Sequence, residues 1–143
     1  MAIIMGRLIG IDYGQRRIGL AVSDPGGRIA TPVTTLAATG SHPKDAEHIL
    51  RWAAEHDATG VVVGLPLSMD GSDSDQTRLA RSLADELRSR GPLPVELWDE
   101  RLSTFQADEL MEAANVPPAR RRKLRDAFAA QVILQSFLDA RRT

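Results

Sequence analysis

Runs of apolar residues divide the chain into strands separated by turns. Three short runs near the N-terminus, at residues 8–12, 18–23 and 27–31, are separated by turn residues and predict consecutive antiparallel strands. A continuous apolar run over 60–65 is typical of a strand that is buried on both faces. The run over 95–100 predicts a fifth strand.

Helical spacing of apolar residues fills the segments between and after these strands. The spacing predicts helices over 41–56 and 75–90, and two more from 103 onward, separated by a break at 115–118 and ending near 142. This order of elements predicts an α/β fold with one mixed sheet, in which a three-strand antiparallel meander is joined by two parallel strands and helices flank the faces. We expect residues 1–143 to form one domain, because no linker divides them.

The composition narrows the class of protein. The chain has 143 residues, of which 43% are hydrophobic and 26% charged, as in ordinary globular domains. It contains no cysteine, which excludes disulfide frameworks, zinc ribbons and thiol nucleophiles. No apolar run is long enough to cross a membrane, and nothing resembles a secretion signal, so we expect a cytoplasmic location.

The charges are unevenly distributed, although the net charge is only -1. Residues 119–143 contain seven arginines and lysines against two aspartates, a net charge of +5, and the rest of the chain carries -6. Such a run is either a solvated helix face or a patch that binds phosphates. Its densest part is the triplet Arg120, Arg121 and Arg122.

Acidic residues fall at the ends of two predicted strands. Asp12 ends the first strand, and Asp99 with Glu100 ends the fifth, so their side chains should leave the same edge of the sheet. Successive side chains alternate between faces, so only one of the last two should share a face with Asp12. Alternatively, Asp12 could cap the following turn, and the acid pair of Asp99 and Glu100 could form a salt bridge to Arg101.

Asp126 lies on the predicted last helix, on the same stripe as Ala130, Ile133 and Phe137. That stripe should be buried, so the carboxylate needs an arginine, a backbone cap or a metal ion as its partner. Three carboxylates without cysteine suit oxygen-preferring cations such as Mg²⁺ or Mn²⁺.

Four segments in order carry a family resemblance that covers nearly the whole chain: GIDYGQRRIGLA at 10–21, VVVGLPLSMDGSDSDQT at 61–77, DERLST at 99–104 and RDAFAAQVILQSFL at 125–138. With these segments the chain resembles the YqgF-type proteins, pre-16S rRNA nucleases or Holliday-junction-resolvase-like proteins of the ribonuclease H-like superfamily. The resemblance implies a ribonuclease H-like fold and divalent-metal nuclease chemistry.

The resemblance also implies roles for single residues. Asp12, Glu100 (or its neighbour Asp99) and Asp126 would be the catalytic acids and would hold two Mg²⁺ or Mn²⁺ ions, with Asp12 bridging them. We favour Glu100 as the ligand and Asp99 as its support, because the longer glutamate side chain reaches further from the strand end. Basic residues would bind the phosphates of the substrate: Arg16, Arg17, Arg101, Arg120, Arg121 and Arg122. Here Gln15-Arg16-Arg17 replaces the Thr-Lys-Ser of the family loop.

Other interpretations remain open at this point. An Asp-x-Gly turn after a first strand also resembles the phosphate loop of actin-like ATPases and sugar kinases, although these bind nucleotide between two such domains. A module that binds structured RNA without cleaving it is a third possibility. Precursor rRNA and branched DNA are both candidate substrates, with RNA favoured by the resemblance, and a homodimer would suit a resolvase.

Overall fold

The computed structural model describes residues 6–100 and 103–141 and contains one five-stranded mixed sheet. The strands are β1 (Leu8–Tyr13), β2 (Arg17–Ser23), β3 (Ala30–Ala37), β4 (Gly60–Leu65) and β5 (Val95–Asp99). Their spatial order is β3-β2-β1-β4-β5, with β1, β2 and β3 antiparallel and β1, β4 and β5 parallel. The predicted meander and the two added parallel strands are confirmed.

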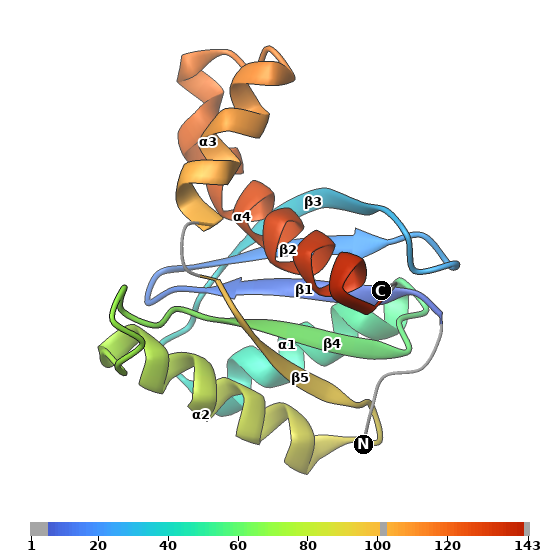
Figure 1. Cartoon of the computed structure of the whole chain (residues 1–143). Coiled ribbons are helices and arrows are strands. Elements are labelled where there is room, and N and C mark those ends of the chain that lie inside the picture. The colour runs from blue at the N-terminus through green and yellow to red at the C-terminus, as the bar shows by residue number, and fades with distance from the viewer. Residues whose placement is uncertain (1–5, 101–102, 142–143) are drawn as a thin grey trace.

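Helices cover both faces of the sheet (Figure 1). They are α1 (His42–Glu55), α2 (Asp75–Arg90), α3 (Ser103–Ala113) and α4 (Pro118–Arg141). The apolar stripes of α1 and α2 pack on one face, where Ile9, Ile11 and Val63 form a buried core with Ile49 and Leu83. The C-terminal part of α4 packs on the other face, so the predicted α/β class is confirmed.

The third strand lies further along the chain than its apolar pattern predicts. That pattern places a strand over residues 27–31, but β3 begins at Ala30 and continues to Ala37. Two backbone N–H groups, of Arg28 and Ile29, donate to Asp24 Oδ1 at 2.8 Å and extend the preceding turn. The β-branched residues beyond the turn then pair with β2, an extension that apolar periodicity alone does not predict.

Close contact between α4 and the sheet depends on glycines. A Cβ added at Gly19 would lie 2.0 Å from Asp126 O, and one added at Gly10 would lie 2.7 Å from Leu134 Cβ. Since any larger residue would collide at Gly19 with helix backbone, this glycine fixes how deeply α4 sits. The carboxyl end of β1 and the turn of α4 that carries Asp126 are therefore held together.

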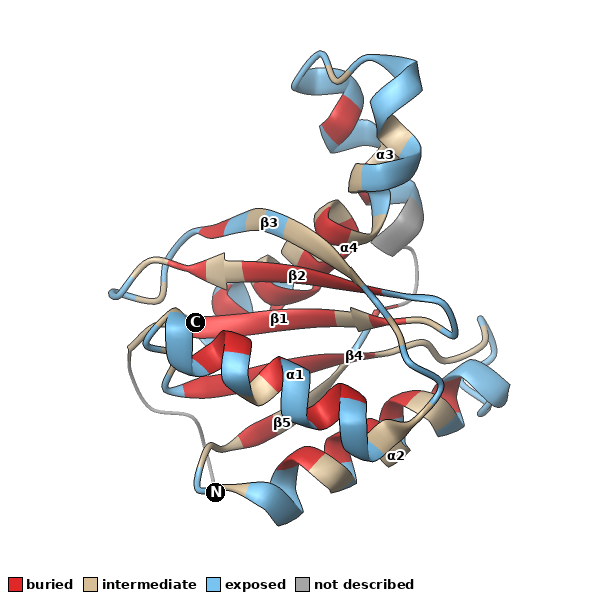
Figure 2. Cartoon of the chain, turned by 180° about the vertical axis from the view of Figure 1, so that it is seen from behind, coloured by how far each residue is buried: buried red, intermediate tan, exposed pale blue. Residues whose placement is uncertain are grey.

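The hairpin of α3 and the first turns of α4 projects beyond the sheet (Figures 1 and 2). Ala107 and Met111 of α3 are buried against α4, whereas the outer surface of the hairpin is largely exposed. Asn115, with φ 57°, reverses the chain, and Pro118 is the first residue of α4. None of the helices in the described ranges has the length and apolarity needed to cross a membrane.

Candidate active site

Asp12 and Glu100 meet on the face of the sheet that α4 covers. Neighbours of Asp12 in β1, Ile11 and Tyr13, belong to the core beneath α1 and α2, so the pleat turns Asp12 toward α4. In β5, Leu97 packs on the α1 and α2 side, and Trp98 packs on the α4 side. Because side chains two residues apart in a strand share a face, Glu100 lies on the α4 side together with Trp98.

The carboxyl groups of Asp12 and Glu100 share a hydrogen bond. Glu100 is 8% exposed, and its carboxyl group lies over Gly64 of β4, where an added Cβ would come within 2.8 Å of it. The backbone N–H of Glu100 donates to Leu65 O at 3.2 Å, which continues the parallel pairing past the end of β5. Asp99, by contrast, is exposed. The sheet thus brings together the two acids that the sequence placed at strand ends.

Asp126 approaches the same edge from α4, where its side chain is paired with an arginine. Arg17 Nε donates to Asp126 Oδ2 at 2.6 Å, and the two side chains are 49% and 20% exposed. Ala130, Ile133 and Phe137 are buried, which confirms the predicted stripe. Of the partners expected for this carboxylate, the structure therefore contains the arginine.

Burial and neighbouring charges shift the pKa of the Asp12 carboxyl group. Burial, followed by repulsion from the Asp126 carboxylate, raises the pKa of Asp12 from 3.8 to about 7. The hydrogen bond to Glu100 and the charge of Arg17 act in the opposite direction and offset part of the rise. Without a cation, the site therefore favours the neutral form of the Asp12 carboxyl group.

The carboxyl oxygens of Asp12 and Glu100 are the ligands that a hard divalent cation prefers. A cation between them would favour the ionised carboxylates that burial now disfavours. Among the described residues, however, no three histidine, aspartate or glutamate side chains are grouped closely enough to hold an ion. Asp126 would have to exchange Arg17 for the cation before it could become a third ligand.

A small open pocket of about 220 Å³ contains the accessible part of this site. Asp12, Asp126 and the turn residues Gln15, Arg16 and Arg17 line it. Two carboxylates and two guanidinium groups in one pocket are a suitable arrangement for a phosphate bound beside a cation. The turn between β1 and β2 supplies the basic side of the pocket.

The arginine triplet of the C-terminal region lies outside this pocket, on the first turns of α4. Arg120 and Arg122 are exposed, whereas Arg121 Nε donates to Val116 O at 2.9 Å and so stabilises the turn before α4. The neighbouring Arg125 pairs with Asp108 of α3 at 3.0 Å. Arg101, the remaining predicted phosphate ligand, falls outside the described residues.

The resemblance included Gly64 only as part of the loop motif after the fourth strand, and sequence reasoning did not single out Asp45. Gly64 makes room for the Glu100 side chain, and the signal was a glycine within an otherwise β-branched strand. Asp45 of α1 is fully buried, and its Oδ2 accepts from the Tyr13 hydroxyl at 2.6 Å. The Tyr13 hydroxyl also lies 3.0 Å from His42 Nδ1, so this network holds the carboxyl end of β1 from below.

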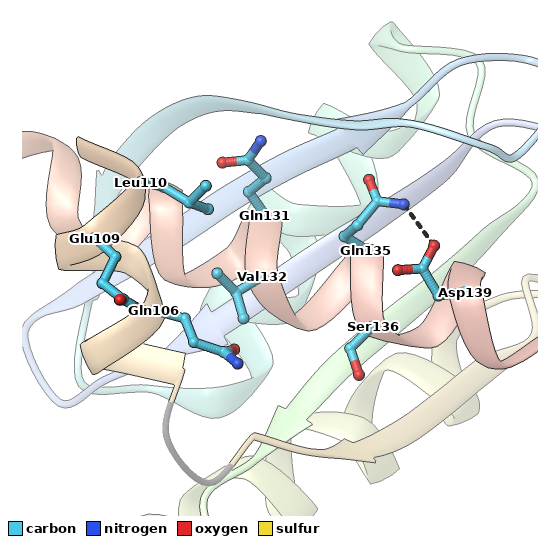
Figure 3. Close-up of a pocket in the computed structure, with 8 residues that line it drawn as sticks. All are labelled: Gln106, Glu109, Leu110, Gln131, Val132, Gln135, Ser136 and Asp139. Atoms are coloured by element: carbon cyan, nitrogen blue, oxygen red, sulfur yellow. Dashed lines mark hydrogen bonds between the residues drawn. The ribbon is translucent and has the colours of Figure 1, made fainter. Parts of the chain in front are cut away.

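A larger hollow of about 680 Å³ lies between α3 and α4 (Figure 3). Glu109 and Asp139 stand at its wall together with glutamine amides, and none of the three candidate acids lines it. Gln135 makes three hydrogen bonds, since its amide group donates to Asp139 and to Arg28 O and accepts from the backbone N–H of Ala30. Two carboxylates disfavour phosphate, so this hollow is a poor site for nucleic acid.

Comparison with known proteins identifies the family of this chain. The family model described as "RuvX: Holliday junction resolvase" matches residues 6–140. A Myxococcus xanthus protein named "Putative pre-16S rRNA nuclease" is 46% identical over 136 residues, which are 95% of this chain and 89% of that protein. A protein of the same name from Anaeromyxobacter dehalogenans is 45% identical and covers 94% of this chain and 98% of its own length.

Among solved structures, Thermus thermophilus RuvC in complex with a Holliday junction substrate is similar, with a TM-score of 0.60 and 16% identity over 96% of each chain. A second Thermus thermophilus RuvC structure gives a TM-score of 0.59. At such low identity this likeness concerns the fold, which is ribonuclease H-like as the resemblance implied. By its match over residues 6–140, and by relatives more than 40% identical along nearly their whole length, the chain belongs to the RuvX family.

Proposed function

We propose that this protein is a divalent-metal-dependent nuclease that hydrolyses phosphodiester bonds during the processing of precursor 16S rRNA. The observation that carries the proposal is the contact between the Asp12 and Glu100 carboxyl groups beside a pocket lined by Arg16 and Arg17. The names of the Myxococcus and Anaeromyxobacter relatives support rRNA as the substrate.

Two Mg²⁺ or Mn²⁺ ions, when bound, would activate a water molecule and stabilise the leaving oxygen. Asp12 and Glu100 would hold them, and Asp126 would join after release from Arg17. The freed guanidinium of Arg17 would then bind the phosphate at the pocket wall, where its fork matches two phosphate oxygens. One arginine thus neutralises Asp126 before the substrate and cation arrive and contacts the substrate afterwards.

Exposed cations in and beside the pocket would hold the flanking backbone. Arg16 lines the pocket, and Arg120 and Arg122 are exposed on the projecting hairpin. Phosphate contacts of this kind give binding that weakens steeply with salt and carry little sequence information. They would position the substrate, while the acids do the chemistry.

Resolution of Holliday junctions is the second candidate, because the family model carries that description. Both activities use the same chemistry and differ in the substrate. A nuclease assay that offers a precursor 16S rRNA fragment and a four-way DNA junction in parallel, with Mg²⁺, with Mn²⁺ and with chelator, separates them. We expect metal-dependent cleavage of the RNA. Cleavage of the junction alone would reassign the substrate, and RNA binding without any cleavage would indicate a non-catalytic module.

A further inference from the structure

A second cavity adjoins the active-site pocket along the edge of the sheet. It encloses about 460 Å³ and is lined by residues 33–37 of β3, by Arg16 and Arg17, and by Lys123 and Leu124 of α4. We call it the β3 groove. Arg16 and Arg17 also line the pocket of Asp12 and Asp126, so the two cavities share a wall. A chain bound across the acids could continue directly into this groove.

The charged side chains of the β3 groove are all cations. Arg16, Arg17 and Lys123 line it, and no carboxylate does. Arg17 is paired with Asp126, but over the described part of the chain neither Arg16 nor Lys123 makes an ion pair. Exposed, unneutralised cations beside a phosphodiester-cleaving site are complementary to the backbone of a nucleic acid.

The groove is also built to a fixed shape. The Thr35 hydroxyl donates to Lys123 O at 3.1 Å and ties α4 to β3 at that point. Along β3, Thr34 pairs with Leu20 and Pro32 with Ala21, so Val33 is the extra residue of a β-bulge. Bulges on edge strands redirect side chains. Here the apolar side chain of Val33, 40% exposed, lines the groove together with Leu36 and Leu124, beside the three cations.

We propose that the β3 groove binds an unpaired nucleotide of the RNA substrate next to the scissile phosphate. Arg16 and Lys123 would contact its phosphates, and Val33 and Leu124 would contact the base. An apolar surface favours an unpaired base, because the face of a paired base is stacked within its helix, and a cavity of this volume is in the range that accepts a small molecule. The inference rests on the proposed function and adds that the RNA must be single-stranded on one side of the cut.

The test measures binding in chelator, so that it does not depend on cleavage. Fluorescence anisotropy would measure binding of a labelled single-stranded RNA that spans the cleavage site, called the full RNA. Two shorter RNAs lack the 5′ flank or the 3′ flank of the site. In two further samples, one flank of the full RNA is annealed to a complementary strand. Lys123→Ala removes one cation of the groove, and Val33→Asp adds a negative charge to its apolar part. Lys44→Ala, an exposed lysine of α1 on the opposite face, is the matched control.

We expect Lys123→Ala to weaken binding of the full RNA several-fold and to reduce the log–log salt slope by about 0.7, the value for one phosphate contact on a single strand. Val33→Asp should weaken binding at least as much, and Lys44→Ala should leave it unchanged. Trimming or annealing one particular flank should abolish the effect of both groove variants, because the nucleotide that they contact is then missing or paired.

The inference would be overturned if Lys123→Ala and Val33→Asp weakened the binding of all the RNAs equally, or if they weakened the binding of none. A change of oligomeric state in Val33→Asp, measured by light scattering, with RNA binding unchanged would show instead that β3 pairs with a second copy of the chain. Cleavage of the full RNA with Mn²⁺ is measured separately. If cleavage occurs while the groove variants behave like Lys44→Ala, the inference fails and the proposed function stands. If no RNA is cleaved, the proposed function fails.

Discussion

At the scale of single residues, the pair of Asp12 and Glu100 shows how far strand periodicity can predict a site. Alternation along residues 95–100 separates Asp99 from Glu100 but does not say which of them faces Asp12. The answer comes from tertiary packing, because Trp98 contacts the core beneath α4 and Gly64 leaves space for the Glu100 carboxyl group. The pairing of Arg17 with Asp126 joins residues 109 apart in the chain and has no local signal at all.

Substitution of the two neighbouring acids should therefore have unequal effects. Glu100→Gln keeps the size of the side chain but removes its charge from the buried contact with Asp12, so we expect loss of both cleavage and Mn²⁺ binding. Asp99→Asn, at an exposed position, should lower activity by about 10–100-fold at most, as loss of a supporting contact does. Isothermal titration with Mn²⁺ distinguishes them, and affinity lost only in Asp99→Asn would reverse their roles.

The raised pKa of Asp12 predicts a pH-dependent stability in the absence of metal. The folded protein retains this proton up to about pH 7, whereas the unfolded chain releases it near pH 3.8, so stability falls as pH rises between these values and is constant above them. Asp12→Asn, which cannot ionise, should be more stable than the wild type above pH 7 in chelator, by up to about 4 kcal/mol, and the difference should shrink toward pH 4. Urea unfolding at several pH values measures it, and a pH-independent difference would contradict the shift.

At the scale of the elements, the sequence predicted nearly all the strands and helices because their apolar periods are clear. The predicted start of β3 was wrong, since an Asx-type turn at Asp24 extends through residues that apolar content alone assigns to a strand. The depth at which α4 sits was not predictable either. It depends on which glycines of the sheet lie beneath the helix, and that is a property of the assembled layers.

Gly19→Ala tests the link between α4 and the site. The added Cβ would lie 2.0 Å from Asp126 O, so α4 must move away from β2 and carry Asp126 with it. We expect a loss of stability of about 1–3 kcal/mol, typical of overpacking, together with a large loss of activity. Gly91→Ala, where an added Cβ meets nothing within 4 Å, is the control. Equal stability of both variants would show that α4 tolerates displacement.

At the scale of the whole molecule, the carboxyl ends of the parallel strands lie at the end of the sheet from which the α3–α4 hairpin projects (Figure 1). Acids from β1, the end of β5 and α4 lie there, and cations flank them in the turn after β1 and on the first turns of α4. The overall charge of -1 hides this separation. The sequence alone shows only where the charges fall along the chain. The fold brings the acidic residues and the basic residues side by side.

In the proposed function, these acids support metal-dependent hydrolysis of a phosphodiester bond. The most direct test compares Mn²⁺-dependent cleavage of a precursor 16S rRNA fragment by the wild type and by Asp12→Asn, with the folded state of both checked by circular dichroism. The substitution keeps the size of the side chain but removes the charge that holds a cation. We predict cleavage by the wild type that chelator abolishes, and none by the folded variant. Undiminished cleavage by Asp12→Asn would contradict the assignment of the site.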